Sequence, residues 1–177
     1  ALRTHGLTGA DTGIVLGTGL GSSVTEALTD RGEVSYSAIP HLPHPALEGH
    51  AGVLRWGRIG LQRVLVFEGR VHCYEGYSAA DVAYAVRLMA VLGVKRVIIT
   101  NIAGGRNSDY HEGDLMLISD HINLMGVNPL VGQNEDWLGP QFPDMSEPYS
   151  LALRAAAKTA AQEVHVPLRE GVYVGVL

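Results

Sequence analysis

An arginine, a histidine and a tyrosine alternate along the short segment Gly69–Tyr77. Arg70, His72 and Tyr74 are each separated by one residue, so in an extended backbone their side chains project to the same side. A guanidinium and an imidazole placed together can bind an oxyanion, and a phenol ring can stand beside them. The segment therefore predicts an oxyanion clamp. The alternative is the polar face of an exposed edge strand.

Two other segments place glycines directly after short apolar runs. Ile14–Leu16 is followed by Gly-Thr-Gly-Leu-Gly, with Thr18 in the turn, and Val97–Thr100 is followed by Asn-Ile-Ala-Gly-Gly. Backbone N–H groups in such turns can approach a ligand closely. In open α/β sheets, ligands bind at the carboxyl ends of the strands. Three such loops predict one ligand site, although a tight turn with nothing bound is the alternative for each.

The first glycine turn is not a nucleotide-binding motif. G-x-G-x-x-G requires a glycine at position 22, where this chain has Ser22, and no acidic residue follows about 20 positions later at a strand end. The phosphate-binding sequence G-x-x-x-x-G-K-[ST] does not occur either. The turn is therefore interpreted as a phosphate-sized nest around the hydroxyl of Thr18.

Apolar patterns predict the strands that carry these loops. Ile14–Leu16 and Val97–Thr100 have no polar alternation, as expected of buried parallel strands covered by helices on both faces. Val53–Trp56 and Leu61–Phe67 predict a hairpin whose turn is Gly57–Gly60. These patterns predict an α/β sheet with the glycine loops at one edge.

One helix is predicted between the hairpin and the strand at Val97. It covers Ala79–Leu92 and ends at Gly93. It would join the two flanking strands as a right-handed β-helix-β unit. Its expected apolar stripe consists of Val82, Val86, Met89 and Ala90.

The remainder of the chain predicts two strands, one long loop and one helix. Strands are expected within Gly113–Asn123 and Gly171–Leu177, the second of them buried, and an Ala-rich helix over Ser150–Glu163. The loop 128–149 contains Trp137 and Phe142, for which no nearby element offers packing. Loops of this length usually have a function, so these aromatic side chains are expected to pack against a partner.

Composition narrows the classes of function. The chain has 177 residues, 46% of them hydrophobic, which fits a single domain over residues 1–177. With 13 Lys and Arg against 18 Asp and Glu, and no dense basic cluster, we expect no nucleic-acid partner. The single cysteine, Cys73, favours a cytoplasmic protein. No apolar run reaches about 18 residues and no signal peptide is recognisable, so we expect no membrane association.

Histidines near the first proline-rich loop raise the question of a metal site. His41 and His44 lie three residues apart, but Pro43 between them excludes a helix that would align the pair. No Cys or HExxH partner accompanies them. We therefore expect solvated histidines and no metal. His50 differs because Gly49 and Gly52 beside it allow the backbone to aim its side chain.

Five segments, in order and spacing, closely resemble the trimeric purine nucleoside phosphorylases. They are Gly17–Gly21, Gly49–Gly52, Gly69–Tyr77, Asn101–Gly105 and Gly113–Asn123. The resemblance covers nearly the whole chain. It implies an α/β domain with a mixed, mostly parallel central sheet flanked by helices.

The resembled family uses inorganic phosphate to cleave the N-glycosidic bond of purine ribonucleosides and deoxyribonucleosides. The products are the free purine base and an α-pentose 1-phosphate, and the reaction serves purine salvage. For this chain the resemblance implies a homotrimer, with a purine nucleoside and phosphate as its ligands. It implies no metal or organic cofactor.

Carried over position by position, the resemblance also implies the site residues. His72 would be catalytic, because an imidazole can adjust the charge of the attacking phosphate. Tyr74 would line the ribose, and Phe142 would reach the ribose of a neighbouring subunit. The phosphate residues would be Thr18, His50, Arg70, Val71, His72 and Ile102, the last through its backbone N–H.

Two of these positions differ from the usual family residue. Thr18 stands where the family usually has Ser, and this change keeps the hydroxyl. Ile102 stands where the family usually has Ala, so it keeps the N–H but adds bulk beside the anion.

The family's purine site has no counterpart in these 177 residues. A Gly-Pro-Ser-Phe-Glu segment would follow Leu177, with later strands that carry the purine-binding Asn and Glu, so the purine-binding residues are expected beyond it. Because an apolar strand is a poor place for a chain to stop, the domain is expected to be truncated at Leu177. The alternative is a non-catalytic, phosphate-binding trimer subunit. Methylthioadenosine phosphorylase is the other enzyme with this fold, but the Asn-Ile-Ala-Gly-Gly-x-Asn loop favours the purine nucleoside enzyme.

Overall fold

The computed structural model describes residues 6–7, 9–17, 21–45 and 51–177. The chain divides into two compact units, Ala1–Ile102 and Ala103–Leu177. The expectation of a single domain over residues 1–177 stays a prediction.

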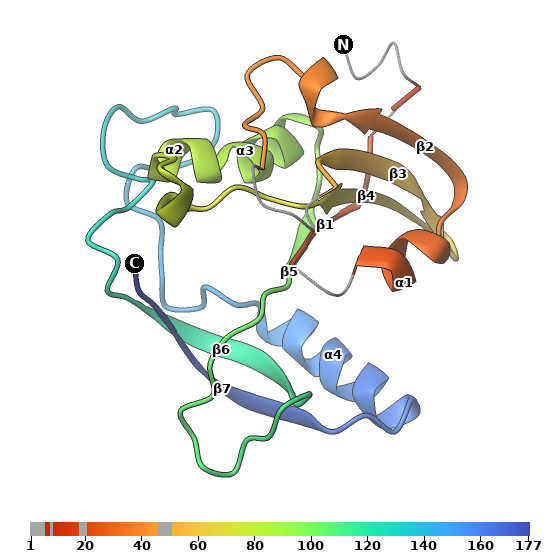
Figure 1. Cartoon of the computed structure of the whole chain (residues 1–177), viewed down its shortest axis with the longest axis vertical. Coiled ribbons are helices and arrows are strands. Elements are labelled where there is room, and N and C mark those ends of the chain that lie inside the picture. The colour runs from red at the N-terminus through yellow and green to blue at the C-terminus, as the bar shows by residue number, and fades with distance from the viewer. Residues whose placement is uncertain (1–5, 8, 18–20, 46–50) are drawn as a thin grey trace. The chain divides into compact units, whose positions relative to one another are not determined.

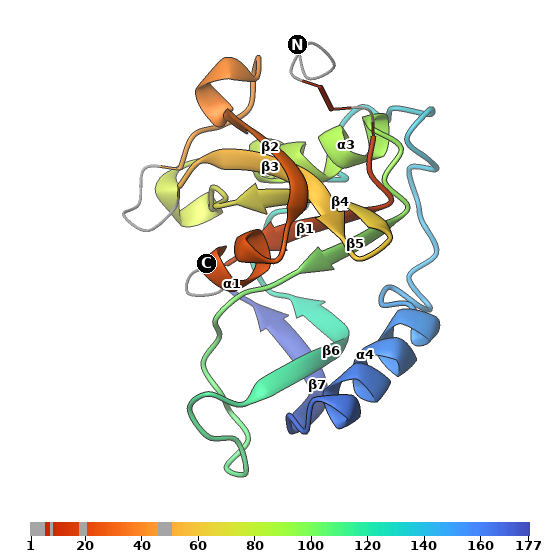
Figure 2. The same ribbon diagram turned by 90° about the vertical axis from the view of Figure 1, so that its right-hand side faces the viewer.

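The first unit contains a five-stranded mixed sheet (Figures 1 and 2). Its strands are β1 (Thr12–Leu16), β2 (Thr29–Ser35), β3 (Val53–Ile59), β4 (Gln62–Glu68) and β5 (Arg96–Ile99), in the order β2-β3-β4-β1-β5. β1 pairs in parallel with both β4 and β5, whereas β2, β3 and β4 form an antiparallel meander. The predicted mixed α/β sheet is confirmed.

Helices cover both faces of this sheet. They are α1 (Gly21–Glu26), α2 (Ala79–Val82) and α3 (Tyr84–Val91), with short 3-10 helices at Tyr36–Ala38 and Cys73–Glu75. Because successive strand residues point to opposite faces, Val15 and Phe67 pack in the core that includes Met89 of α3. Ile14 and Val66 pack in a second core on the other face. The two central strands are therefore buried from both sides, as predicted for Ile14–Leu16.

The hairpin β3–β4 is confirmed, but its turn is shorter than predicted. Gly57 lies within β3, opposite Val64, and the turn is made by Gly60 and Leu61. Gly60 has φ +57, a conformation that favours glycine. Gly57 serves another purpose, because a Cβ there would lie 2.6 Å from the carbonyl oxygen of Thr29.

The predicted helix over Ala79–Leu92 is divided at Ala83 into α2 and α3. Ser78 caps α2 by accepting a hydrogen bond from the backbone N–H of Asp81. The predicted stripe is correct for Met89 and wrong for Val86 and Ala90, which are exposed. Met89 fixes the face of α3 because it packs where Gly13 lacks a side chain. The other core-facing residues are Tyr84, Ala85, Leu88 and Leu92.

The predicted burial of the strand at Val97 is wrong, although the strand itself is present. β5 is the edge strand of the first sheet, with β1 as its neighbour. Its apolar residues are exposed, with Ile99 at 57%. Their β-branched pattern is the same as that of a central strand, so the pattern could not distinguish the two positions.

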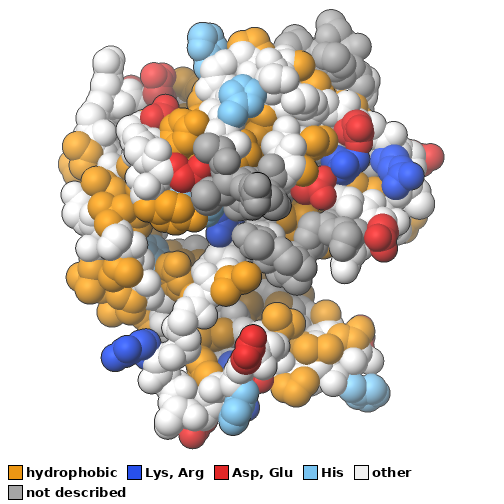
Figure 3. Space-filling model, viewed as in Figure 1, with side chains coloured by type: hydrophobic (Ala, Val, Ile, Leu, Met, Phe, Trp, Pro, Cys, Tyr) orange, Lys and Arg blue, Asp and Glu red, His pale blue; other side chains and the backbone are white. Residues whose placement is uncertain are grey.

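The second unit contains the parallel pair β6 (Leu115–Asn123) and β7 (Leu168–Gly175) and the helix α4 (Leu151–Glu163). Both predicted strands and the helix are confirmed. Ser150 caps α4 by accepting a hydrogen bond from the N–H of Leu153. The prediction that the last strand is buried is wrong, since Val172 is 52% exposed. A two-stranded sheet leaves much of each strand uncovered, and Leu115, Ile122 and Val174 are also exposed. Figure 3 shows hydrophobic side chains at many places on the visible face of the molecule.

The loop between β6 and α4 has no helix or strand, and residues 124–150 are all described. Both of its ends are bonded to β6. The Asn123 amide donates to the Val127 carbonyl oxygen at 2.9 Å, and the Tyr149 hydroxyl lies 3.2 Å from Nδ1 of His121. Between these ends, Trp137 and Phe142 are exposed, and Phe142 is 88% exposed. Both aromatic side chains are therefore exposed in this structure, and their packing against a partner stays a prediction.

Candidate functional site

The three predicted loops leave the first sheet at the same edge. β4, β1 and β5 are parallel neighbours, and Leu16 pairs with Glu68 while Val15 pairs with Ile99. The segments that follow these strands, beginning at Gly17, Gly69 and Thr100, therefore start side by side. The prediction of a single loop cluster is confirmed for the described part of the chain.

Arg70 is held in place from two directions. Its Nε donates a hydrogen bond to Nε2 of His72 at 3.2 Å. Its Nη1 donates to the carbonyl oxygen of Thr100. The guanidinium thus links the loop after β4 to the loop after β5, and its plane is fixed by two separate acceptors.

His72 is oriented by Glu75. One carboxylate oxygen of Glu75 lies 2.8 Å from Nδ1 of His72 and accepts the backbone N–H of His72, also at 2.8 Å. Since Nε2 accepts from Arg70, the proton of a neutral imidazole lies on Nδ1 and is donated to Glu75. The Glu75 side chain is only 6% exposed, so this bond is shielded from water.

Tyr74 stacks on the imidazole of His72. The ring centroids are 4.6 Å apart and the planes differ by 12°. The predicted extended backbone holds at His72, with φ −131 and ψ 154, but Tyr74 lies in the 3-10 helix Cys73–Glu75. The grouping of the three side chains is therefore confirmed, whereas the predicted cause is wrong for Tyr74, because a turn brings its ring to the cluster. Tyr74 is 68% exposed, so one side of its ring can meet a ligand.

A buried tyrosine anchors the start of this loop. The Tyr36 hydroxyl donates to the carbonyl oxygen of Gly69 at 2.7 Å, and its N–H donates to the carbonyl oxygen of Gly52 at 2.8 Å. Burial, aided by the Glu68 carboxylate, raises the pKa of Tyr36, so its hydroxyl stays protonated and can donate. Tyr36 thus ties Arg70's loop to the core.

The other predicted site residues differ in how the structure places them. Thr18 and His50 lie outside the described residues. Val71 is buried, so its side chain belongs to the core and its backbone is the part that could meet an anion. Ile102 is exposed two residues after Thr100, at the same sheet edge. Phe142 belongs to the second unit.

Sequence reasoning missed three residues that hold the cluster together. Glu75 had a usable signal, because an acidic residue three positions after His72 fits a side chain reaching back to the start of a short helix. Thr100 was read only as part of an apolar run. Tyr36 gave no signal, since its partners lie 16 and 33 residues away.

Metal ligands are not grouped anywhere in the described residues, where no set of three or more His, Cys, Asp or Glu side chains could hold a metal ion. His41 and His44 are both exposed. Among the described helices, none is both long and apolar enough to span a membrane.

Residues 11–177 match the family model of the phosphorylase superfamily. Purine nucleoside phosphorylase 1 of Geobacillus stearothermophilus is 50% identical over 92% of this chain and 59% of its own length. The purine nucleoside phosphorylase of Rattus norvegicus is 39% identical over 98% of this chain and 61% of its own length. The chain thus spans about three fifths of the length of these curated relatives.

Solved structures of purine nucleoside phosphorylases also superimpose on this chain. Isoform 2 of the Schistosoma mansoni purine nucleoside phosphorylase, in complex with cytosine and ribose-1-phosphate, superimposes with a TM-score of 0.88 at 40% identity, over 97% of this chain and 61% of that chain. A purine nucleoside phosphorylase of the same organism in complex with adenosine gives a TM-score of 0.89 at 36% identity, over 98% and 62% of the two chains.

Proposed function

The chain belongs to the phosphorylase superfamily. We propose that the protein cleaves the N-glycosidic bond of purine ribonucleosides and deoxyribonucleosides with inorganic phosphate. The products would be the free purine base and an α-pentose 1-phosphate, in purine salvage. The relatives named above are purine nucleoside phosphorylases, and solved structures of such enzymes hold hypoxanthine or adenosine. These complexes support a purine nucleoside as the substrate.

The observation that carries the proposal is the cluster of Arg70, His72 and Tyr74 at the loop edge of the sheet. A guanidinium held by Thr100 and His72 presents a permanent positive charge in a fixed orientation. Ile102 follows on the neighbouring loop, where a backbone N–H can add to an anion site. This arrangement suits a phosphate at the carboxyl ends of β4 and β5.

The chemistry follows from where phosphate would be held. Breaking the bond between a purine and its sugar builds positive charge on the sugar, as in an oxocarbenium-like transition state. A phosphate anion held beside that carbon stabilises the charge and is also the nucleophile at high effective concentration. Positioning the anion would supply most of the rate enhancement.

His72 would manage the proton of the phosphate. Glu75 holds the proton of the neutral ring at Nδ1, so Nε2 is the nitrogen that can accept another. When phosphate binds, the Nε–H of Arg70 would turn from His72 to a phosphate oxygen. Nε2 could then take a proton from the phosphate and raise its negative charge before attack.

Tyr74 and Phe142 would contact the sugar. Tyr74 lies beside His72 with an exposed ring, which suits an apolar contact with ribose. Phe142 is 88% exposed on the long loop, and in a homotrimer it would close the ribose site of a neighbouring subunit. Phosphate is a co-substrate, and the family resemblance implies no metal or organic cofactor. The single cysteine favours a cytoplasmic enzyme.

The test is phosphate-dependent release of base from inosine, with and without phosphate and after treatment with a chelator. We expect hypoxanthine and ribose 1-phosphate in equal amounts, only with phosphate and unaffected by the chelator. Methylthioadenosine as the preferred substrate would favour the other enzyme of this fold. Phosphate binding without any base release would identify a non-catalytic subunit.

Arg70→Ala should weaken phosphate binding by about 2 kcal/mol or more, because a charge-assisted hydrogen bond is lost. Arg58→Ala is the matched control, since Arg58 donates to the carbonyl oxygen of Leu61 at the opposite end of the hairpin. An unchanged phosphate affinity in Arg70→Ala, measured by titration calorimetry, would refute the clamp.

A further inference from the structure

We propose that Thr100 is a positioning residue that aligns the loops after β1, β4 and β5 for phosphate. The inference rests on the proposed function and adds a residue to its site. Thr100 immediately follows β5 and is half-buried. It is bonded to both of the other loops, the first through its hydroxyl and the second through its carbonyl.

The hydroxyl of Thr100 holds the start of the loop after β1. Oγ1 accepts a hydrogen bond from the backbone N–H of Gly17 at 2.9 Å. The N–H of Thr100 donates to the carbonyl oxygen of Val15 at 3.0 Å, which extends the β1–β5 pairing by one residue. Because a β-branched side chain has few χ1 rotamers, this backbone bond also fixes where the hydroxyl points.

The carbonyl oxygen of Thr100 holds the guanidinium of Arg70, whose Nη1 donates to it. A carbonyl oxygen has two lone pairs and a fixed direction, so it defines one side of the guanidinium. His72 defines the other side through the bond from Nε. Thr100 is therefore as direct a determinant of the Arg70 orientation as His72 is.

Gly17 makes the close approach of these loops possible. A Cβ atom at this position would lie 2.7 Å from the carbonyl oxygen of Thr100 and 3.0 Å from Cα of Asn101. Both neighbours are backbone atoms, which cannot move aside cheaply. The two loops therefore meet backbone to backbone, and the hydroxyl of Thr100 bonds across this contact.

A threonine that only stabilised the end of β5 would affect folding and leave the site unchanged. The two roles are separable, because positioning predicts a selective loss of phosphate affinity. We compare Thr100→Val, which removes the hydroxyl and keeps the β-branched shape, with Thr100→Ser, which keeps the hydroxyl. Thr29→Val is the matched control, since the Thr29 hydroxyl is likewise bonded to the backbone of the same sheet, donating to the carbonyl oxygen of Arg58 at 3.3 Å.

The first measurement is the Kd for inorganic phosphate, by titration calorimetry on the intact protein that contains this chain. Thr100→Val should weaken phosphate binding about tenfold, as expected for one lost hydrogen bond of the loop network. Thr100→Ser and Thr29→Val should stay within about twofold of the unsubstituted chain. A Thr100→Val variant with unchanged phosphate affinity overturns the proposal. So does a Thr100→Ser variant that loses as much affinity as Thr100→Val.

The second measurement is hydrogen exchange of the Gly17 amide, which requires no activity. In Thr100→Val this amide should exchange faster, while amides within β4 keep their protection. Unchanged exchange at Gly17 overturns the proposal, as does a uniform loss of protection across the sheet. Normal phosphate binding without base release would refute the proposed function alone. A chain that does not bind phosphate at all would overturn both.

Discussion

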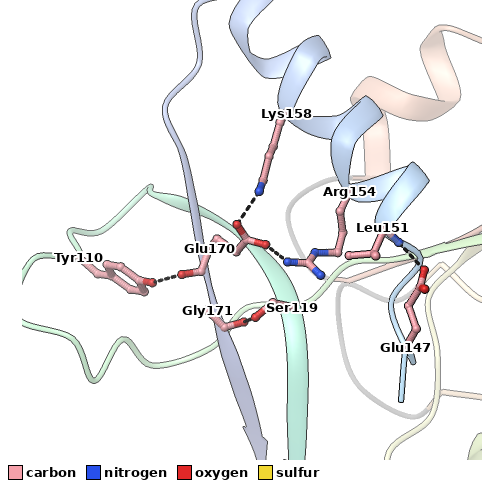
Figure 4. Close-up of polar contacts among 8 residues, drawn as sticks. All are labelled: Tyr110, Ser119, Glu147, Leu151, Arg154, Lys158, Glu170 and Gly171. Atoms are coloured by element: carbon pink, nitrogen blue, oxygen red, sulfur yellow. Dashed lines mark hydrogen bonds and ion pairs between the residues drawn. The ribbon is translucent and has the colours of Figure 1, made fainter. Parts of the chain in front are cut away.

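Each of the two units is stabilised internally by a different kind of interaction. In the first, residues of β1, β4 and α3 form buried cores on both faces of a sheet. In the second, whose residues 103–177 are all described, no side chain is buried. There α4 is joined to β7 by Glu170, which pairs with Arg154 and with Lys158 (Figure 4).

This difference fits the two tasks that the proposed function assigns to the two units. A clamp for phosphate must hold its donors within fractions of an ångström, which requires side chains fixed by a packed core. The described residues that we propose for the phosphate site, Arg70, Val71, His72 and Ile102, all belong to the first unit. The second unit carries Phe142, exposed on a long loop, as suits a residue proposed to act in a neighbouring subunit.

The largest expected effect is a difference in unfolding free energy between substitutions of the chain's two phenylalanines, Phe67 and Phe142. Phe67 is 1% exposed in the core of the first unit, and Phe142 is 88% exposed. Phe67→Ala should lower the free energy of unfolding by about 3–5 kcal/mol, because it leaves a cavity. Phe142→Ala should change it by less than about 0.5 kcal/mol. Urea unfolding measures both.

Phe142 should matter for activity although it contributes little to stability. Phe142→Ala should lose nucleoside turnover while it keeps its affinity for phosphate, because the residues proposed to bind phosphate lie elsewhere in the chain. A Phe142→Ala variant with full turnover, or a fully active monomer by light scattering, would refute the shared site. A stability loss similar to that of Phe67→Ala would show that Phe142 is packed, contrary to the comparison of the two units.

A smaller effect is expected from adding one methyl group to a glycine in each unit. Gly17→Ala would place Cβ 2.7 Å from the Thr100 carbonyl oxygen, so we expect a loss of about 1–3 kcal/mol of unfolding free energy. Gly104→Ala has no atom within 4 Å of the added Cβ and should be near neutral. Thermal unfolding compares them. Equal stability of the two variants would mean that the loops after β1 and β5 do not pack as described.

A carboxylate that accepts a backbone N–H occurs in each unit and gives a third comparison. Glu75 accepts from His72 and Glu147 accepts from Leu151 at the start of α4, at 2.8 Å and 2.7 Å. Glu75→Gln keeps the acceptor but removes the charge from a shielded site, and should lower kcat/KM about tenfold. Glu147→Gln should leave kcat/KM unchanged. Steady-state kinetics of the two variants measures this difference.

Short-range patterns predicted most of the elements that carry the site. Apolar runs followed by glycines located β1, β4 and β5, and the alternation of Arg70 and His72 located the side chains of the proposed clamp. These features are encoded within a few residues of sequence. The burial of β5 was not, because a β-branched run has the same composition at the edge of a sheet as at its centre.

The side chains that support the clamp were also hard to predict. Thr100 meets Gly17 across 83 residues and Arg70 across 30, and Tyr36 meets Gly69 across 33. Such contacts depend on the order of strands in the sheet, which a local pattern does not contain. Glu75 is the exception, since its three-residue spacing from His72 was visible in the sequence.

The smallest expected effect concerns the polar link between α4 and β7. Hydrogen bonds from Arg154 and then Lys158 hold the pKa of Glu170 below its ordinary value. A carboxyl group with a lowered pKa in the folded state stabilises that state above its unfolded pKa, about 4.3. This contribution is lost as the pH falls through the lower folded pKa. Acid below about pH 4 should therefore loosen α4, while the buried core of the first unit responds less.

Hydrogen exchange of the α4 amides, expressed as protection factors, measures this loosening. In Glu170→Gln the side chain cannot ionise, so α4 should be less protected at neutral pH and should lose little more on acidification. The matched variant is Asp11→Asn, which removes an exposed carboxylate bonded to Arg63 in the first unit and should leave α4 unchanged. If Glu170→Gln still showed the full acid response, the response would arise from another carboxyl group. Asp114, bonded to Arg169 of β7 at 3.2 Å, would then be the residue to substitute.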